Sequence, residues 1–224
     1  MFKKIKKSLI IAPHPDDEVL GVGGTISRMI ASNIYVHVIF MGGHLPPIYK
    51  RSEYENTKIE AMGALKKLGC YNYTFIENRA TYFNKVDLSE FNKPIETLIK
   101  KIKPNLVFIP FPDRHLDHKV TFEASMVATR PIDYVKPYMV LSYEVLSETH
   151  WNASGIESNF VPDFFVDIGN DYIKKKCEAL KMYKSQIKGN LARSVDAIKS
   201  LSKFRGSQAN LRNAEAFKVI RQII

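Results

Sequence analysis

The sequence predicts an α/β protein with three layers, in which helices cover both faces of a mostly parallel sheet. The first observation is an alternation of short apolar, β-branched runs with stretches of helical periodicity. The second is that the runs 34–41 and 106–110 are apolar almost throughout, as in strands buried on both faces. No linker, repeat or low-complexity segment interrupts the 224 residues, so we expect a single domain over 1–224.

The expected elements follow one another along the chain. Strands are predicted over 8–12, 34–41, 73–76, 105–110, 138–145 and 164–168. Helices are predicted over 22–31, 54–68, 88–102, 121–129 and 172–183. The helix over 54–68 ends at Gly69, a typical C-terminal residue. Its apolar face is predicted from Ile59, Met62, Leu65 and Leu68. Residues 185–224 show a helical, more polar pattern, and we expect this tail to pack on the domain.

The number of cysteines and the lengths of the apolar runs indicate the cellular compartment of the protein and whether it crosses a membrane. The two cysteines, Cys70 and Cys177, leave one disulfide open but make no disulfide framework, so we expect free thiols. The apolar run after the basic start is shorter than the roughly 7–15 residues of a signal-peptide core. No segment approaches the roughly 18 apolar residues of a transmembrane helix. We therefore expect a cytoplasmic protein.

The formal net charge of +10 allows two interpretations. One is a lysine-rich solvated surface, and the other is an acidic partner such as a phosphate-bearing substrate. The lysines are scattered and do not alternate with aromatic residues on one face, as a nucleic-acid groove requires. Nucleic-acid binding is therefore not predicted.

Two polar clusters follow predicted strands. Residues 14–18 read His-Pro-Asp-Asp-Glu and come directly after the first apolar run, whereas residues 115–118 read His-Leu-Asp-His and follow the run 105–110. Burying adjacent carboxylates is costly unless a cation offsets their charge. Parallel sheets bind ligands beyond the carboxyl ends of their strands. We therefore expect the two clusters to meet at a divalent metal ion.

Glycines follow the first cluster, at Gly21, Gly23 and Gly24. They do not fit the G-x-G-x-x-G pattern of a dinucleotide site, and no phosphate-loop Gly-Lys-Ser is present. We expect them instead to allow tight packing of a helix on the sheet.

Both clusters resemble motifs of a known family. Residues 13–18, Pro-His-Pro-Asp-Asp-Glu, resemble the (A/P)HPDDE signature of the PIG-L (LmbE-like) de-N-acetylases, and 115–118 resemble their H-x-D-H motif. Residues 147–152, 193–194 and 205–206 look like the branch found with bacterial glycan biosynthesis. The resemblance implies a Rossmann-like fold and hydrolysis of N-acetyl groups from amino sugars, usually with zinc.

The resemblance also implies a role for each residue. The metal ligands would be His14, Asp17 and His118. Asp16 would be the general base, with a helix N-cap as its structural alternative. His115 would stabilise the oxyanion as a cation or serve as an acid, and Asp117 would orient a neighbouring histidine. Two imidazoles and a carboxylate suit Zn²⁺, and Fe²⁺ or Mn²⁺ fit them as well.

Further residues are predicted to contact the substrate, each with a structural alternative: His44, Arg51, Arg114, Trp151 and Asn152. The alternative for His44 is a solvated loop, and for Trp151 it is burial in a packed site. Arg114 follows Asp113, which stands where some family members carry a tyrosine, and the alternative is an ion pair between these two. A last group is expected only to hold the tail by ion pairs: Glu148, Arg193, Arg205 and Glu215.

The sequence thus predicts a zinc-dependent hydrolase that removes the N-acetyl group from a GlcNAc-type amino sugar or its glycoconjugate, phosphate-linked or not. One alternative is a metal-containing protein that binds nucleotide sugars without hydrolysis. The other is hydrolysis of a different amide or ester by the same centre. Homo-oligomers are common among soluble proteins, and the sequence leaves the oligomeric state open.

Overall fold

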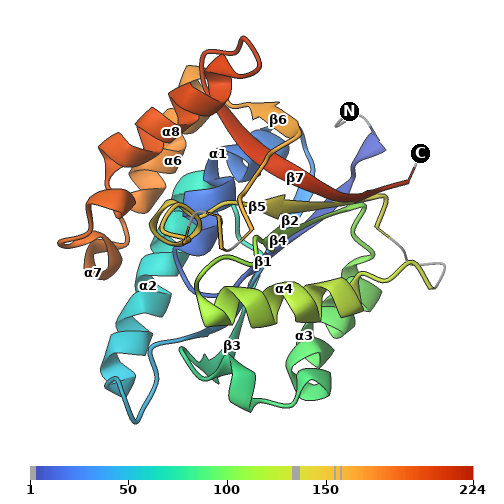
Figure 1. Cartoon of the computed structure of the whole chain (residues 1–224), viewed down its shortest axis with the longest axis vertical. Helices are drawn as coiled ribbons and strands as arrows, with labels where there is room; N and C mark the ends of the chain where they lie inside the picture. The colour runs from blue at the N-terminus through green and yellow to red at the C-terminus, as the bar shows by residue number, and fades with distance from the viewer. Residues whose placement is uncertain (1–3, 133–136, 154, 157, 224) are drawn as a thin grey trace.

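A computed structural model describes residues 4–132, 137–153, 155–156 and 158–223 (Figure 1). Its sheet has seven strands in the order β3-β2-β1-β4-β5-β7-β6. The parallel strands are β1 (Lys7–Ala12), β2 (Tyr35–Gly43), β3 (Tyr73–Arg79), β4 (Leu106–Pro110) and β5 (Met139–Tyr143). Strand β7 (Ala214–Gln222) runs antiparallel to both of its neighbours, β5 and β6 (Phe164–Asp167). The predicted mostly parallel α/β sheet is confirmed.

Helices form a layer on each side of this sheet (Figure 1). One layer contains α1 (Asp17–Ala31), α2 (Arg51–Leu68), α6 (Gly169–Leu180) and α8 (Val195–Ser207), and the other contains α3 (Leu88–Ile102) and α4 (Leu116–Ala128). Strand β1 shows why both faces are covered. Leu9 and Ile11 belong to the core under α3 and α4, whereas Ile10 and Ala12 belong to the core under α1 and α2. This three-layer, Rossmann-like arrangement confirms the predicted fold class.

The C-terminal tail is not helical throughout, so that part of the prediction is wrong. After α7 (Lys184–Ile187), the 3₁₀ turn η3 (Leu191–Arg193) and α8, the chain enters the sheet as β7. This strand pairs on both sides, and its Phe217 is fully buried. Pairing with two strands far away in sequence satisfies the backbone and overrides the local pattern.

The buried face of α2 also differs from the prediction. Ile59 and Met62 are 64% and 37% exposed. The buried positions are Tyr54, Thr57, Ala61, Ala64, Leu65 and Leu68. Small residues let α2 approach the segment after α6 closely, since a Cβ at Gly63 would lie 2.8 Å from Cε of Met182. The buried face therefore combines the small residues Thr57, Ala61 and Ala64 with Tyr54, Leu65 and Leu68, and it excludes Ile59 and Met62.

The order of the strands changes direction between β1 and β4, which are neighbours in register Ser8↔Leu106 and Ile10↔Phe108. Strands β2 and β3 continue on one side and β5 on the other. The segments that leave β1 and β4 therefore share one crevice, where α1 and α4 begin. A ligand site is expected at this point.

The structure also bears on the predictions about the glycines, the cysteines and membrane-spanning helices. Cβ atoms at Gly21 and Gly24 would lie 2.2 Å from Tyr143 and 2.9 Å from Ile168, which confirms that these glycines allow tight packing. The two cysteines are free and buried, as predicted. Within the described part of the chain, no helix has both the length and the apolar character needed to cross a bilayer.

Candidate active site

The predicted catalytic and metal-binding residues all lie in the crevice between β1 and β4. His14 and Asp16 precede α1, and Asp17 is its first residue. His115 precedes α4, whose first turn contains Asp117 and His118. The positive ends of both helix dipoles therefore point at this acidic cluster. The ring centres of His14 and His118 are 5.9 Å apart, so these two segments, about a hundred positions apart in sequence, do meet.

Each of these two histidines has one ring nitrogen held by a buried carboxylate. His14 Nε2 lies 2.8 Å from Asp117 Oδ2, and His118 Nδ1 lies 3.0 Å from Asp113 Oδ2. The remaining nitrogens both face Asp17 Oδ2, His14 Nδ1 at 3.5 Å and His118 Nε2 at 3.4 Å. A carboxylate that keeps the proton on one nitrogen leaves the other free for a metal ion. His14, Asp17 and His118 therefore form a ready donor set.

A second set of donors, His14 with His115 and Asp117, also lies within 4.8 Å. Its atoms are already engaged. Asp117 accepts the backbone N–H groups of Thr81 and Phe83 as well as the His14 contact. His115 Nδ1 accepts the N–H of Asp117. Asp17 Oδ2 also accepts a hydrogen bond, from the backbone N–H of His14 at 2.9 Å, but the ring nitrogens that face it, His14 Nδ1 and His118 Nε2, are the ones not held by Asp117 or Asp113.

The protonation of the site indicates a place for a cation. Burial lowers the pKa of His14, but hydrogen bonds and charge from Asp117 and Asp17 outweigh it and raise the pKa to about 9. Asp17 and Asp113 likewise raise the pKa of His118 well above its usual value, against the effect of burial. Positive charge therefore collects between buried carboxylates. A divalent ion in place of these protons would neutralise the same carboxylates, and the donor set fits Zn²⁺, Fe²⁺ or Mn²⁺.

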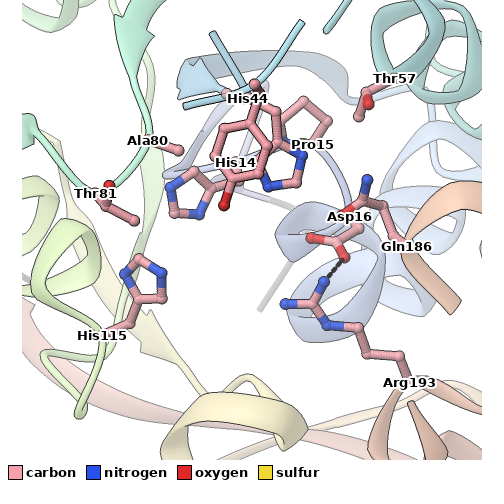
Figure 2. Close-up of a pocket in the computed structure, with 12 residues that line it drawn as sticks. His14, Pro15, Asp16, His44, Thr57, Ala80, Thr81, His115, Gln186 and Arg193 are labelled. Carbon is pink, nitrogen blue, oxygen red and sulfur yellow. Dashed lines mark ion pairs between the residues drawn. The ribbon is translucent and has the colours of Figure 1, made fainter. Parts of the chain in front are cut away.

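Asp16 has an unusual backbone conformation, with φ 116° and ψ −28°. A positive φ is strained for a residue other than glycine and is concentrated at functional sites. The backbone N–H of Asp16 donates to Glu18 Oε2 at 3.0 Å, and Glu18 Oε1 accepts the Tyr183 hydroxyl at 2.6 Å. Asp16 occupies the N-cap position of α1, as the structural alternative predicted, but its side chain makes no capping hydrogen bond. Instead, the carboxylate lines the pocket (Figure 2).

The Asp16 carboxylate faces Arg193, whose Nη1 lies 2.8 Å from Oδ2 (Figure 2). The geometry of this ion pair is not that of a hydrogen bond, and Oδ2 has no hydrogen-bond donor among the described residues. Burial raises the pKa of Asp16 to about 7, although the positive charge of Arg193 opposes the shift. A carboxylate that lines the pocket and has a pKa near neutrality suits a general base.

His115 differs from the cationic residue that was expected. Its Nδ1 accepts the Asp117 N–H at 3.1 Å and so caps α4. Burial lowers its pKa to about 4, and the positive charges of His14 and His118 add to the shift. Burial and the nearby positive charges therefore both disfavour the cationic His115 that the resemblance implies. The neutral ring keeps its proton on Nε2 and lines the pocket as a hydrogen-bond donor (Figure 2).

The pocket itself encloses about 480 Å³ of space, including its open mouth. His44, predicted to contact the substrate, lines it, with its ring centre 4.3 Å from that of Tyr49. Arg51 does not line it. The Arg51 guanidinium is bound on the surface to Glu55 at 2.9 Å and to Glu77 at 2.6 Å.

The other predicted substrate contacts also lie outside the residues that line this pocket. Trp151 is 54% exposed, so its alternative of burial in a packed site is wrong. The amide of Asn152 donates to Ser158 O at 3.1 Å. Arg114 reaches Glu148 at 3.5 Å, whereas Asp113 contacts His118. The alternative of an Asp113–Arg114 ion pair is therefore wrong.

Two further residues of the site, Asp113 and Arg193, were not predicted from the sequence. Asp113 orients His118 and also accepts the Thr149 hydroxyl at 2.8 Å. Its position directly after an apolar run and five residues before His118 is the signal that indicates it. Arg193 forms ion pairs, as expected: one with Glu148 at 3.6 Å, and another with Asp16 within the pocket at 2.8 Å. No local pattern marks that role, because the contact joins residues far apart in the chain.

The chain was compared with known proteins. Residues 9–129 match the model of the PIG-L family, GlcNAc-PI de-N-acetylase. An uncharacterized deacetylase of Escherichia coli (strain K12), YaiS, is 32% identical over 194 residues, which cover 81% of this chain and 92% of that protein. The diacetylchitobiose deacetylase of Thermococcus kodakarensis is 26% identical over 240 residues, which cover 98% of this chain and 85% of that protein.

A solved structure supports the fold. The N,N'-diacetylchitobiose deacetylase of Pyrococcus horikoshii, complexed with its inhibitor MPG, superimposes with a TM-score of 0.76 at 22% identity. The match covers 98% of this chain and 85% of that one. Together with the family match over both motifs, these similarities show that the chain belongs to the PIG-L family of deacetylases.

Proposed function

We propose that this protein is a metal-dependent hydrolase that removes the N-acetyl group from an N-acetylated amino sugar or its glycoconjugate. One observation carries the proposal. Two buried carboxylates turn His14 and His118 toward Asp17, and the neighbouring Asp16 lines the same pocket. The names of the matched family and of the diacetylchitobiose deacetylases both refer to N-acetylated sugars, which supports this class of substrate.

The metal would be held by His14, Asp17 and His118. The family resemblance implies Zn²⁺, and the donor set does not distinguish it from Fe²⁺ or Mn²⁺. When bound, such an ion polarises the amide carbonyl and lowers the pKa of water. Three protein ligands also leave coordination positions open for substrate and solvent.

The chain's own residues then account for the proton transfers. Asp16 accepts a proton as water adds to the carbonyl carbon, and Arg193 keeps its carboxylate in place. The neutral His115 donates its Nε2–H to the oxyanion that forms. The proton held by Asp16 passes to the nitrogen as the C–N bond breaks. Acetate and the free amine of the sugar are the products.

The test is a screen of the purified protein against N-acetylated amino sugars, with free amine as the measured product. We expect a chelator to abolish amine formation and Zn²⁺, Fe²⁺ or Mn²⁺ to restore it. Other amides and esters are included in the same screen. Binding of nucleotide sugars with no amine released in any metal state would overturn the proposal and support a binding protein. Cleavage only of other amides or esters would retain the metal centre but refute the substrate.

A further inference from the structure

The backbone of Asp16 is held in its strained conformation from both sides. On the carbonyl side, the Asp16 oxygen accepts the N–H groups of Val19 at 3.1 Å and Leu20 at 2.9 Å, in the first turns of α1. On the other side, the Asp16 N–H donates to Glu18 Oε2 at 3.0 Å. The unusual angle is φ, at 116°, which describes rotation about the bond between this nitrogen and Cα. Strained backbone persists only where surrounding groups fix it, so the bond to Glu18 is a necessary support.

The side chain of Glu18 is fixed in turn by Tyr183. Glu18 Oε1 accepts the Tyr183 hydroxyl at 2.6 Å, and both residues are fully buried. A glutamate side chain contains several single bonds about which it can rotate, and a hydrogen bond at one oxygen does not stop all of these rotations. With the Tyr183 hydroxyl on Oε1, the other oxygen stays on the Asp16 N–H. Water cannot replace the hydroxyl at a site this buried without disturbing the packing around it.

Tyr183 comes from the C-terminal part of the chain, where the backbone fixes its position. It lies between α6 and α7, and its carbonyl accepts the N–H groups of Gln186 and Ile187, both at 3.1 Å. Its ring belongs to the core under α1 and α2. A packed ring on a hydrogen-bonded turn therefore brings the hydroxyl to Glu18, which is 165 positions away in sequence.

The backbone conformation of Asp16 decides where its carboxylate points. Rotation about the N–Cα bond turns the side chain relative to the crevice, and the carboxylate lines the pocket. Arg193 pairs with Oδ2 of this carboxylate and so supports the side chain, whereas Glu18 supports the backbone. A displacement of about 1 Å at a reacting group is enough to lower a rate by roughly 100-fold. Both supports therefore bear on the reaction.

We propose that Tyr183 is a positioning residue for the general base, because its hydroxyl holds Glu18 against the backbone of Asp16 and so aims the Asp16 carboxylate into the pocket. Tyr183 is not one of the described residues that line the pocket, so it acts through Glu18 and not on the substrate. This inference rests on the proposed function, in which Asp16 is the base.

The first test is Tyr183→Phe, which removes only the hydroxyl. With the best substrate of the amino-sugar screen, we expect kcat to fall about tenfold, while KM stays within about twofold of the wild type and the metal content is unchanged. The matched control is Tyr143→Phe, since the Tyr143 hydroxyl is equally buried but donates to the backbone carbonyl of Ile11 at 2.8 Å.

Both tyrosine variants lose one buried hydrogen bond, so the Tm of each should fall by a few degrees. Only Tyr183→Phe should lower kcat, because a loss of stability alone does not move the base. A wild-type kcat for Tyr183→Phe, or an equal loss of kcat in both variants, would overturn the inference.

A second set of variants tests whether Tyr183 acts through Glu18. Glu18→Met removes the carboxylate and should lower kcat at least as much as Tyr183→Phe. Adding Tyr183→Phe to Glu18→Met should lower kcat no further, because the hydroxyl no longer has a group to hold. The same loss from Tyr183→Phe with and without the Glu18 carboxylate contradicts the proposal. Should Glu18→Met fail to fold, the crystal structure of Tyr183→Phe decides.

Crystal structures also separate this inference from the proposed function. If the wild type releases no amine from any substrate, the proposed function fails, and the conformation of Asp16 still tests the role of Tyr183. We expect a positive φ at Asp16 in the wild type and in Tyr143→Phe, and a carboxylate displaced by about 1 Å or more in Tyr183→Phe. A negative φ in the wild type, or the same Asp16 conformation in the wild type and in Tyr183→Phe, overturns the inference.

Discussion

Two regions of the molecule contribute to the site in different ways. The strand-end segments 14–17 and 113–118 supply the donor and acceptor atoms from two short stretches, and most of these side chains are buried. The C-terminal segment 183–222 supplies single side chains, such as Arg193 and Gln186, and ion pairs attach it to the core. We infer that the first region determines the chemistry, whereas the second determines stability and the position of groups at the pocket.

The largest expected effect lies in the first region, at Asp16. Asp16→Asn keeps the shape of the side chain but removes the oxygen that accepts a proton, so kcat should fall about 10³-fold. The metal content should stay at the wild-type level, because Asp16 is not in the donor set. Asp171→Asn, an exposed position on α6, is the matched control. A near-wild-type rate for Asp16→Asn would remove Asp16 as the base.

The second prediction concerns an anchor of the C-terminal segment. Glu144 follows β5 and accepts from Arg205 Nε at 2.8 Å and Nη2 at 2.7 Å, and both side chains are nearly inaccessible. Glu144→Gln leaves a buried guanidinium without its counter-charge, which should cost about 3–5 kcal/mol and lower Tm by roughly 6–20 °C. Thermal unfolding measures this effect. The matched change at an exposed ion pair, Glu55→Gln, should cost less than about 1 kcal/mol.

The same anchor predicts a dependence of stability on pH. Burial raises the pKa of Glu144, but His150 and Arg205 outweigh it and hold the pKa below the usual 4.5. Since the folded-state pKa is the lower one, ionised Glu144 stabilises the fold above about pH 4.5, and this stability is lost as pH falls through the folded-state pKa. The Tm difference between wild type and Glu144→Gln should therefore shrink in acid. A constant difference between pH 7 and pH 3 contradicts the assignment.

A smaller effect is expected from the carboxylates that orient the two histidines. Asp113→Asn and Asp117→Asn weaken the acceptors opposite His118 and His14, and each should lower metal affinity by about 10–100-fold. Competition with a chelator of known affinity measures this loss, and Asp171→Asn again serves as the control. Unchanged affinity in both variants would argue against the donor set that contains Asp17.

The smallest expected effect is at Arg193, where the two regions meet. Arg193→Met removes the group that holds Asp16 and should lower kcat/KM about tenfold with the metal retained. Arg193→Lys should recover part of the activity, since it restores the charge without the planar fork. Arg212→Met, at an exposed position of the same segment, is the control. A lower Tm with unchanged kcat/KM would make Arg193 an anchor only.

Local patterns predicted most of the scaffold. The helix over 88–102 has the bounds that its periodicity and the following Pro104 indicate. Both motifs come directly after strands, and parallel sheets bind ligands beyond the carboxyl ends of their strands. The proximity of residues 14–18 to 115–118 could therefore be predicted. Strand β7 was not predicted, because its partners β5 and β6 come from elsewhere in the chain and its local pattern does not show them.

The sequence by itself determined the fold class and the chemical groups of the site, because periodicity and contiguous motifs are properties of neighbouring residues. Only the tertiary structure decided which ring nitrogens of His14 and His118 face Asp17, that burial and nearby charge lower the pKa of His115, and that Arg193 faces Asp16. Those properties depend on burial and on charges from distant segments. Electrostatic effects of this kind arise only when folding brings such charges together away from water.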